Sequence, residues 1–270
     1  MVVLQVIGGG RMGEALVGGL VHAGTVAAAD VVVVEPVAAR REELAAALPG
    51  VALATEPTEA EGTIIAVKPA DVPAACEAAA RAGSGRVLSI AAGVTIAALE
   101  AALAPGTPVV RAMPNTPSLV GKGAAAIAAG TAATDDDLAW AETLLGAVGT
   151  VARVSEPLLD AVTGLSGSGP AYVFLVAEAL IDAGVLAGLP RPVSRELAIQ
   201  TLLGAATLLA ESDEGPEALR AAVTSPGGTT AAGLRVLEQR GVRAALLDAV
   251  AAAADRARQL GSSPPARPHH

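Results

Sequence analysis

Short apolar runs alternate with helix-length segments along the first half of the chain. The runs at 2–7, 31–34 and 87–90 are almost continuously apolar, which is typical of strands buried on both faces of a sheet. Further strands are expected at 51–53, 63–67, 109–112, 124–128 and 150–154, and the intervening helices at 13–23, 38–48, 71–82, 96–103 and 135–145. This alternation predicts an α/β domain with a parallel sheet covered by helices on both faces.

The pattern changes after about residue 156, where the predicted strands stop. Helices are expected from there on at 170–187, 193–210, 217–223, 230–240 and 242–260. The helix from Pro170 is apolar on nearly all sides, and such a helix must be buried. Because these helices cannot bury so much apolar surface among themselves, we expect a partner subunit. The predicted domains are an α/β domain at 1–155, an all-α dimerisation and substrate domain at 156–261 and a disordered tail at 262–270.

Amino-acid composition limits the expected cellular location and indicates an oligomer. Apolar residues make up 52% of the chain but aromatic residues only 1%, so small side chains fill the core and extra burial in an oligomer is valuable. No uninterrupted apolar run is long enough for a membrane span, and the first residues do not resemble a signal peptide. Cys76 is the single cysteine, which excludes an internal disulfide framework. We therefore expect a cytoplasmic protein with no membrane partner.

Charge and histidine content exclude further classes of function. The net charge of −9 argues against a nucleic-acid partner, which would require a basic face. Histidine occurs at His22 and at the terminal His269 and His270, in a proline-rich tail where no metal role is expected. A histidine-dependent hydrolase or zinc enzyme would therefore have to be built around His22 alone, and no metal site is predicted.

A glycine-rich loop follows the first predicted strand. Gly8, Gly10 and Gly13 form a GxGxxG pattern, which is a weak signal by itself in a chain with 30 glycines. Its position between a strand and a helix is the arrangement that places a pyrophosphate on a helix N-terminus. The loop therefore predicts a Rossmann-type dinucleotide site.

Residues near the end of the second predicted strand give conflicting signals about the cofactor. Glu35 at the strand end could bind the ribose 2′-hydroxyl of NADH, whereas Arg40 and Arg41 could bind the 2′-phosphate of NADPH. Alternatively, Glu35 caps the next helix and the arginines form a solvated face. NADPH and NADH both remain open.

Three more loops follow predicted strand ends, where open α/β sheets bind ligands. These loops are residues 66–69, 89–93 and 111–117. Ala91 and Ala92 would leave room for the nicotinamide end of the cofactor. Lys68 could equally be a solvated charge at a strand end, and Arg111 a partner in a structural ion pair. Together the loops predict one rim of a ligand site.

Hydroxyl side chains and two adjacent glycines cluster at residues 224–230, where a predicted helix begins. Ser225, Thr229 and Thr230 offer neutral donors and acceptors, and backbone N–H groups at a helix N-terminus favour an anion. Such a site suits a small carboxylate that carries a nitrogen. An ordinary capped turn between helices would use the same residue types.

In this order, these segments resemble the pyrroline-5-carboxylate reductase family. The matching segments are 8–13, 66–69, 89–94, 113–117, 160–172 and 224–230. The resemblance implies a Rossmann domain followed by a helical domain that interlocks with its twin, commonly in a pentamer of dimers. It also implies reduction of 1-pyrroline-5-carboxylate to L-proline by NADPH or NADH, the last step of proline biosynthesis.

The resemblance further implies roles for individual residues. The residues that would contact the cofactor are Gly8, Gly9, Gly10, Arg11, Met12, Ala66, Val67, Lys68, Pro69, Ile90, Ala91 and Ala92, and the predicted cofactor set also includes Glu35, Arg40 and Asn115. Thr229 and Thr230 would bind substrate, with Thr230 at the ring nitrogen. The backbone of Gly227 and Gly228 would hold the carboxylate, and Ser225 completes the predicted catalytic set.

Two residues depart from the family pattern. Ala222 stands where some members have an asparagine that contacts the cofactor, so that contact should be missing. Glu35 stands where NADPH-preferring relatives often have a small hydroxyl residue, which weakens the expectation of NADPH unless Arg40 and Arg41 compensate.

Two rival functions are less well supported. A β-hydroxyacid dehydrogenase uses a lysine early in its helical domain as acid and base, but no lysine follows Lys122 here. A dinucleotide-binding regulator without turnover would not need the hydroxyl cluster at 225–230. Hydride transfer to a cyclic imine that arrives protonated needs no strong general acid, which fits a site built from hydroxyls and backbone donors.

Overall fold

A computed structural model describes residues 2–262, which form two compact units. The first unit comprises residues 2–168 together with 251–262, and the second comprises residues 169–250. The first unit contains the strands, whereas the second is helical. The chain therefore leaves the strand-containing unit once and returns to it through its last helix. The predicted tail, with His269 and His270, lies outside the described residues apart from its first position.

The strands within residues 2–262 form one eight-stranded sheet in the order β3-β2-β1-β4-β5-β6-β7-β8. Their bounds are β1 (Val2–Ile7), β2 (Val31–Val34), β3 (Ala52–Ala54), β4 (Ala60–Ile65), β5 (Val87–Ser89), β6 (Val109–Met113), β7 (Gly123–Ala129) and β8 (Gly149–Arg153). The strand order reverses between β1 and β4, and ligands bind at such a switch point in open α/β sheets.

One strand pair differs from the predicted parallel sheet. All neighbouring strands run parallel except β6 and β7, which are antiparallel. Only residues 114–122 connect these two strands, and they include a 3₁₀ helix at Thr116–Val120. A parallel crossover needs a longer connection, so the chain turns back instead. The sheet is mostly parallel, and the prediction is wrong at this pair.

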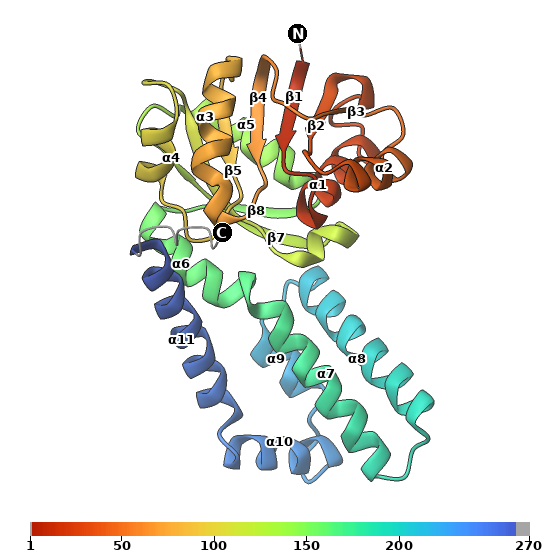
Figure 1. Cartoon of the computed structure of the whole chain (residues 1–270). Coiled ribbons are helices and arrows are strands. Elements are labelled where there is room, and N and C mark those ends of the chain that lie inside the picture. The colour runs from red at the N-terminus through yellow and green to blue at the C-terminus, as the bar shows by residue number, and fades with distance from the viewer. Residues whose placement is uncertain (1, 263–270) are drawn as a thin grey trace, which may run out of the picture. The chain divides into compact units, whose positions relative to one another are not determined.

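Helices cover both faces of the sheet (Figure 1). One face packs against α1 (Arg11–His22), α2 (Ala38–Ala47) and α5 (Asp135–Gly146), and the other against α3 (Val72–Ala82) and α4 (Ile96–Ala102). Every residue of β2 is buried because both of its faces are covered. The predicted α/β architecture with buried apolar strands is therefore confirmed.

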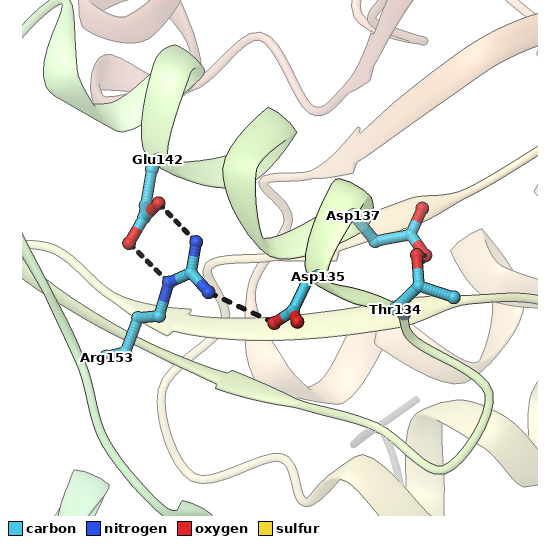
Figure 2. A network of polar contacts seen from close by, with 5 residues as sticks. All are labelled: Thr134, Asp135, Asp137, Glu142 and Arg153. Atoms are coloured by element: carbon cyan, nitrogen blue, oxygen red, sulfur yellow. Dashed lines mark hydrogen bonds and ion pairs between the residues drawn. The ribbon is translucent and has the colours of Figure 1, made fainter.

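Polar contacts join α5 to the edge strand β8. Arg153 binds the two carboxylate oxygens of Glu142 at 2.6 and 2.7 Å and reaches Asp135 at 3.2 Å (Figure 2). At the start of α5, the Asp137 carboxylate accepts hydrogen bonds from the backbone N–H and the hydroxyl of Thr134, both at 2.8 Å. The hydrogen bonds from Arg153 lower the pKa of Glu142 below its usual range. The Thr134–Asp137 capping box satisfies the first turn of α5, and Arg153 links this helix to β8.

A continuous helical stretch from Glu156 to Leu186 connects the strands to the helical unit. It contains a 3₁₀ turn (Glu156–Leu158), α6 (Leu159–Val162), a π-helix (Thr163–Gly167) and α7 (Gly169–Leu186). The sequence predicted α7 but no helix between residues 156 and 169. Gly167 is instead accommodated in the π-helix, where a side chain would lie 2.5 Å from Met113 Cε.

The length and composition of this stretch are also sufficient for a membrane span. The sequence predicted no membrane span, because glycines interrupt the apolar residues of this stretch. An apolar helix that a partner subunit covers can have the same length and composition as a membrane span.

The helical unit consists of α7, α8 (Arg191–Glu211), α9 (Pro216–Ala222), α10 (Thr229–Gln239) and the first part of α11 (Val242–Ser262). The Ser194 hydroxyl at the start of α8 donates to the Ile181 carbonyl at 2.7 Å, and no side chain would fit at Gly184 beside it. None of the described residues of α7 is buried, and Phe174 is 63% exposed in the isolated chain. This apolar exposure agrees with the expectation of a partner subunit.

Candidate active site

The glycine-rich loop combines two structurally required glycines with one open position. Gly8 has a φ of +109°, and a side chain there would lie 2.6 Å from the Ala66 carbonyl oxygen. A side chain at Gly13 would overlap the Gly8 carbonyl, so this glycine allows α1 to pack closely against the loop. No atom lies within 4 Å of the position that a Gly10 side chain would take. The loop therefore fits a pyrophosphate approaching the start of α1 at Gly10.

A cavity of about 300 Å³ lies at the carboxyl ends of β1, β4, β5 and β6. Its lining consists of Met12, Ala66, Val67, Pro69, Ile90, Ala91, Ala92, Met113, Pro114, Asn115, Thr116 and Gly167. The structure thus brings together the loops that the sequence placed on one rim. Met113, Pro114 and Thr116 belong to a predicted rim loop, although they were not among the predicted contact residues. Gly167 was missed because no local pattern connects the π-helix with the strand ends.

Asn115 holds two distant parts of the cavity wall together. Its Nδ2 donates to the Ser166 carbonyl at 3.0 Å, and its Oδ1 accepts from the Ala124 N–H at 2.9 Å. The side chain is buried, and both of its polar ends bond to the protein backbone. Asn115 lines the cavity, where it was predicted to contact the cofactor, and its two hydrogen bonds also position the π-helix beside β7.

Glu35 and Arg40 both bind the backbone of Gly9, Glu35 at its N–H group and Arg40 at its carbonyl group. Glu35 Oε2 accepts from the Gly9 N–H at 3.1 Å, and its Oε1 accepts from the Val37 N–H at 2.9 Å. Arg40 Nε donates to the Gly9 carbonyl at 2.8 Å, and the guanidinium pairs with Glu14 and Glu43. Glu35 is therefore connected both to the start of α2 and to the glycine loop.

The other candidate cations lie outside the cavity lining. Arg111 pairs with Glu156 at 2.9 Å, and the same Glu156 oxygen accepts from the Ile96 N–H at 2.6 Å. Arg111 is therefore a structural ion-pair partner, one of the two alternatives open from the sequence. Lys68 and Arg11 are exposed at the ends of their loops.

The predicted substrate segment forms the turn before α10, within the helical unit. Gly228 is the N-cap residue, and no side chain caps the helix. Gly227 has a φ of +69°, the Gly228 N–H donates to the Ser225 carbonyl at 3.0 Å, and a side chain at 228 would overlap the Ser225 hydroxyl. The helix begins at Thr229, within one residue of the prediction. The sequence left open an ordinary turn capped by a side chain, and that cap is absent at α10. The backbone N–H groups in the first turn of α10 therefore have no side-chain acceptor at the N-cap position.

Comparison with known proteins places the chain in a family. Residues 156–260 match the model for pyrroline-5-carboxylate reductase dimerisation, and residues 3–93 match the model for coenzyme F420-dependent NADP oxidoreductase. Pyrroline-5-carboxylate reductase from Synechocystis sp. is 46% identical over 264 residues, covering 96% of this chain and 98% of that protein. The chain belongs to the pyrroline-5-carboxylate reductase family.

Other pyrroline-5-carboxylate reductases agree in sequence and in structure. The Mycobacterium tuberculosis protein is 45% identical, with 97% of each chain covered. The solved reductase from Coxiella burnetii has a TM-score of 0.90 and 35% identity over 96% of this chain and 98% of that one. The Plasmodium falciparum pyrroline carboxylate reductase, solved with NADP bound, has a TM-score of 0.84 and 29% identity over 97% and 98% of the two chains.

Proposed function

We propose that this protein reduces 1-pyrroline-5-carboxylate to L-proline with NADPH or NADH, the last step of proline biosynthesis. Relatives named for this activity match nearly the whole chain, and one solved relative has NADP bound. The observation within the chain that carries the proposal is the cavity at four strand ends beside the open position at Gly10.

The described residues fit a nicotinamide dinucleotide. The backbone at Gly10 and the start of α1 would receive the pyrophosphate. The small side chains of Ala91 and Ala92 leave space in the cavity for the nicotinamide end. The bound cofactor supplies the hydride, and the protein supplies orientation and exclusion of water.

The turn before α10 would bind the substrate. The backbone around Gly227 and Gly228, at the start of α10, would hold the carboxylate, since an uncapped helix N-terminus favours an anion. The hydroxyl of Thr230 would hold the ring nitrogen, with Thr229 and Ser225 beside it. No strong general acid is needed because the cyclic imine arrives protonated, and the rate then depends on orientation.

The dimerisation family model supports an assembly of two copies of the chain. Because the dimerisation model covers residues 156–260, we infer a homodimer formed through this segment. The pentamer of dimers that the sequence resemblance implies stays a prediction. The family model begins at residue 156, where the predicted helical domain begins, whereas the compact units of the structure divide after residue 168 and again after residue 250. We also infer a cytoplasmic enzyme that uses no metal and has neither a nucleic-acid nor a membrane partner.

An absorbance assay tests the proposed reaction directly. The protein is mixed with 1-pyrroline-5-carboxylate and either NADPH or NADH, and the loss of reduced cofactor is followed together with the formation of proline. We expect stoichiometric oxidation of at least one cofactor. If neither is oxidised, the proposal is wrong.

The Thr230→Ala variant tests the substrate site. We expect kcat/KM to fall by about tenfold or more, since a hydrogen bond of on the order of 1 kcal/mol is lost together with the orientation of the ring. Cofactor affinity should stay unchanged. Thr224→Ala is the matched control, because the Thr224 hydroxyl already bonds to the Arg220 carbonyl at 2.6 Å. An unchanged kcat/KM in Thr230→Ala would contradict the assigned role.

A further inference from the structure

Arg40 is fully engaged by neighbours within the protein. Its Nε donates to the Gly9 carbonyl at 2.8 Å, one terminal nitrogen pairs with Glu43 at 2.6 Å, and the other pairs with Glu14. Glu43 and Glu14 together raise the pKa of Arg40. Each guanidinium nitrogen therefore has an acceptor, and two carboxylates offset the single positive charge.

Negative charge also borders the glycine loop directly. Glu35 lies at the end of β2 with one carboxylate oxygen on the Gly9 N–H. Arg41, the next cation along α2, donates one terminal nitrogen to the carbonyls of Glu35 and Pro36 at 2.7 and 2.8 Å. The carboxylates of Glu14, Glu35 and Glu43 thus outnumber the two guanidinium groups around this end of β2.

We propose that this arrangement makes the enzyme select NADH over NADPH, with Glu35 as the specificity-determining residue and Glu14 and Glu43 as residues that withhold Arg40 from the cofactor. In a Rossmann site, the residue at the end of the second strand faces the adenosine ribose. A 2′-hydroxyl can donate a hydrogen bond to Glu35. A 2′-phosphate would instead meet a carboxylate, and Arg40 could bind it only after breaking its ion pairs.

Selectivity is the difference between the affinities for NADH and for NADPH. Glu35 strengthens the binding of NADH and weakens the binding of NADPH, so both effects favour NADH. Juxtaposed like charges weaken binding at an interface, and about 1.4 kcal/mol corresponds to tenfold in affinity. The inference rests on the proposed function only in that a nicotinamide dinucleotide binds at the glycine loop.

Direct titration of the complete protein with each cofactor, without substrate, tests the inference. The fluorescence of NADH and NADPH is followed on binding, with calorimetry as a second readout. We expect NADH to bind at least about tenfold more tightly than NADPH. Equal affinities, or tighter binding of NADPH, would overturn the inference.

Charge-neutralising variants test which residues are responsible. Glu35→Ser should weaken NADH and strengthen NADPH. Glu43→Gln and the double variant Glu14→Gln/Glu43→Gln should strengthen NADPH stepwise, by about fivefold or more in the double variant, while NADH affinity stays within about twofold. Glu43 is largely exposed, so the single variant remains informative if the double variant does not fold.

The matched control is Glu42→Gln. Glu42 is exposed on the same helix, and Glu42→Gln changes the net charge by the same amount as Glu43→Gln. The ion pairs of Arg40 are made with Glu43 and Glu14, so this substitution leaves them in place. We expect Glu42→Gln to leave the NADH to NADPH affinity ratio unchanged. An equal shift in this control would overturn the role of the ion pairs and assign the effect to overall charge.

The titration also separates this inference from the proposed reaction. Because no pyrroline-5-carboxylate is present, a protein that selects NADH but does not reduce the imine would refute the proposed function alone. A protein that reduces the imine and binds both cofactors equally would refute the selection alone.

Discussion

At the scale of single residues, the three glycines of the GxGxxG motif differ in what requires them. Gly8 needs its positive φ, and Gly13 needs the absence of a side chain beside the Gly8 carbonyl. Gly10 has open space where a side chain would be, so neither packing nor conformation requires glycine there. The sequence motif does not distinguish the three positions. Only the structure shows which glycines the fold requires and which position leaves space for a ligand.

Alanine substitutions should separate these roles. Gly13→Ala should lower the free energy of unfolding by about 1–3 kcal/mol, because the new methyl group overlaps the backbone. Gly10→Ala should cost under about 1 kcal/mol, the range for a change of N-cap residue, but should weaken cofactor binding by about tenfold. Urea unfolding and cofactor titration measure the two effects, and equal destabilisation by both variants would contradict the assignment.

The thiol of Cys76 should be unreactive in the folded protein. Cys76 is fully buried within α3, and burial raises the pKa of its thiol from an ordinary 9.0 to about 11. Because thiolate is the reactive form, we expect a thiol reagent to react slowly with the native protein and rapidly in denaturant. Rapid reaction of the native protein at neutral pH would contradict this burial.

The same raised pKa predicts a loss of stability at alkaline pH. The unfolded thiol ionises near pH 9, whereas the folded thiol keeps its proton until about pH 11. The contribution of Cys76 to the free energy of unfolding is therefore complete below pH 9 and decreases as the pH rises towards 11. Cys76→Ala should lack this part of the pH dependence, which chemical denaturation at several pH values would measure.

At the scale of secondary structure, the sequence predicts each strand of the sheet and the helices that cover it. The periodicity of apolar positions reports burial directly, which is why β2 and α3 agree closely with their predicted ranges. The misjudged elements have two different causes, distant packing at the π-helix and a short connection before β7. The π-helix at Thr163–Gly167 fits against Met113, and β7 turns back because the connection after β6 is short.

Asn115 should connect the stability of these elements to cofactor binding. Asn115→Ala removes the bonds to the Ser166 carbonyl and the Ala124 N–H and leaves both groups without this partner. We expect a loss of about 1–3 kcal/mol in the free energy of unfolding and weaker cofactor binding at the cavity. Ser166→Ala is the matched control, because the Ser166 hydroxyl bonds to Val162 and only its backbone meets Asn115. Equal effects of the two variants would contradict this role.

At the scale of the whole molecule, the apolar surface of α7 indicates that one chain is an incomplete unit. Phe174 and Leu175 are 63% and 65% exposed in the isolated chain, and residues 156–260 match a dimerisation model. Exposed apolar surface of this extent in a described helix marks an interaction site. The helical unit therefore depends on a second copy for its core.

Phe174→Asp should disrupt the assembly. A charge in the apolar surface of α7 is costly to bury, so we expect a smaller mass by light scattering and a lower midpoint of thermal unfolding. Asp182→Ala is the control on the same helix, because Asp182 is exposed and pairs with Arg191 of its own chain. An unchanged mass for Phe174→Asp would place the subunit interface elsewhere.

The sequence by itself determined the strands, the helices, the glycine loop after β1 and the hydroxyl cluster before α10. Periodicity and turn chemistry are local, so they can be read without knowing what lies nearby. The tertiary structure alone decided that β7 runs antiparallel, that Gly167 reaches the cavity and that Arg40 is held by Glu14 and Glu43. The contact of Gly167 with Met113 and the pair of Arg40 with Glu14 join residues far apart in the chain, which meet only once the strand order and helix packing are fixed. The direction of β7 follows instead from the geometry of the short connection after β6.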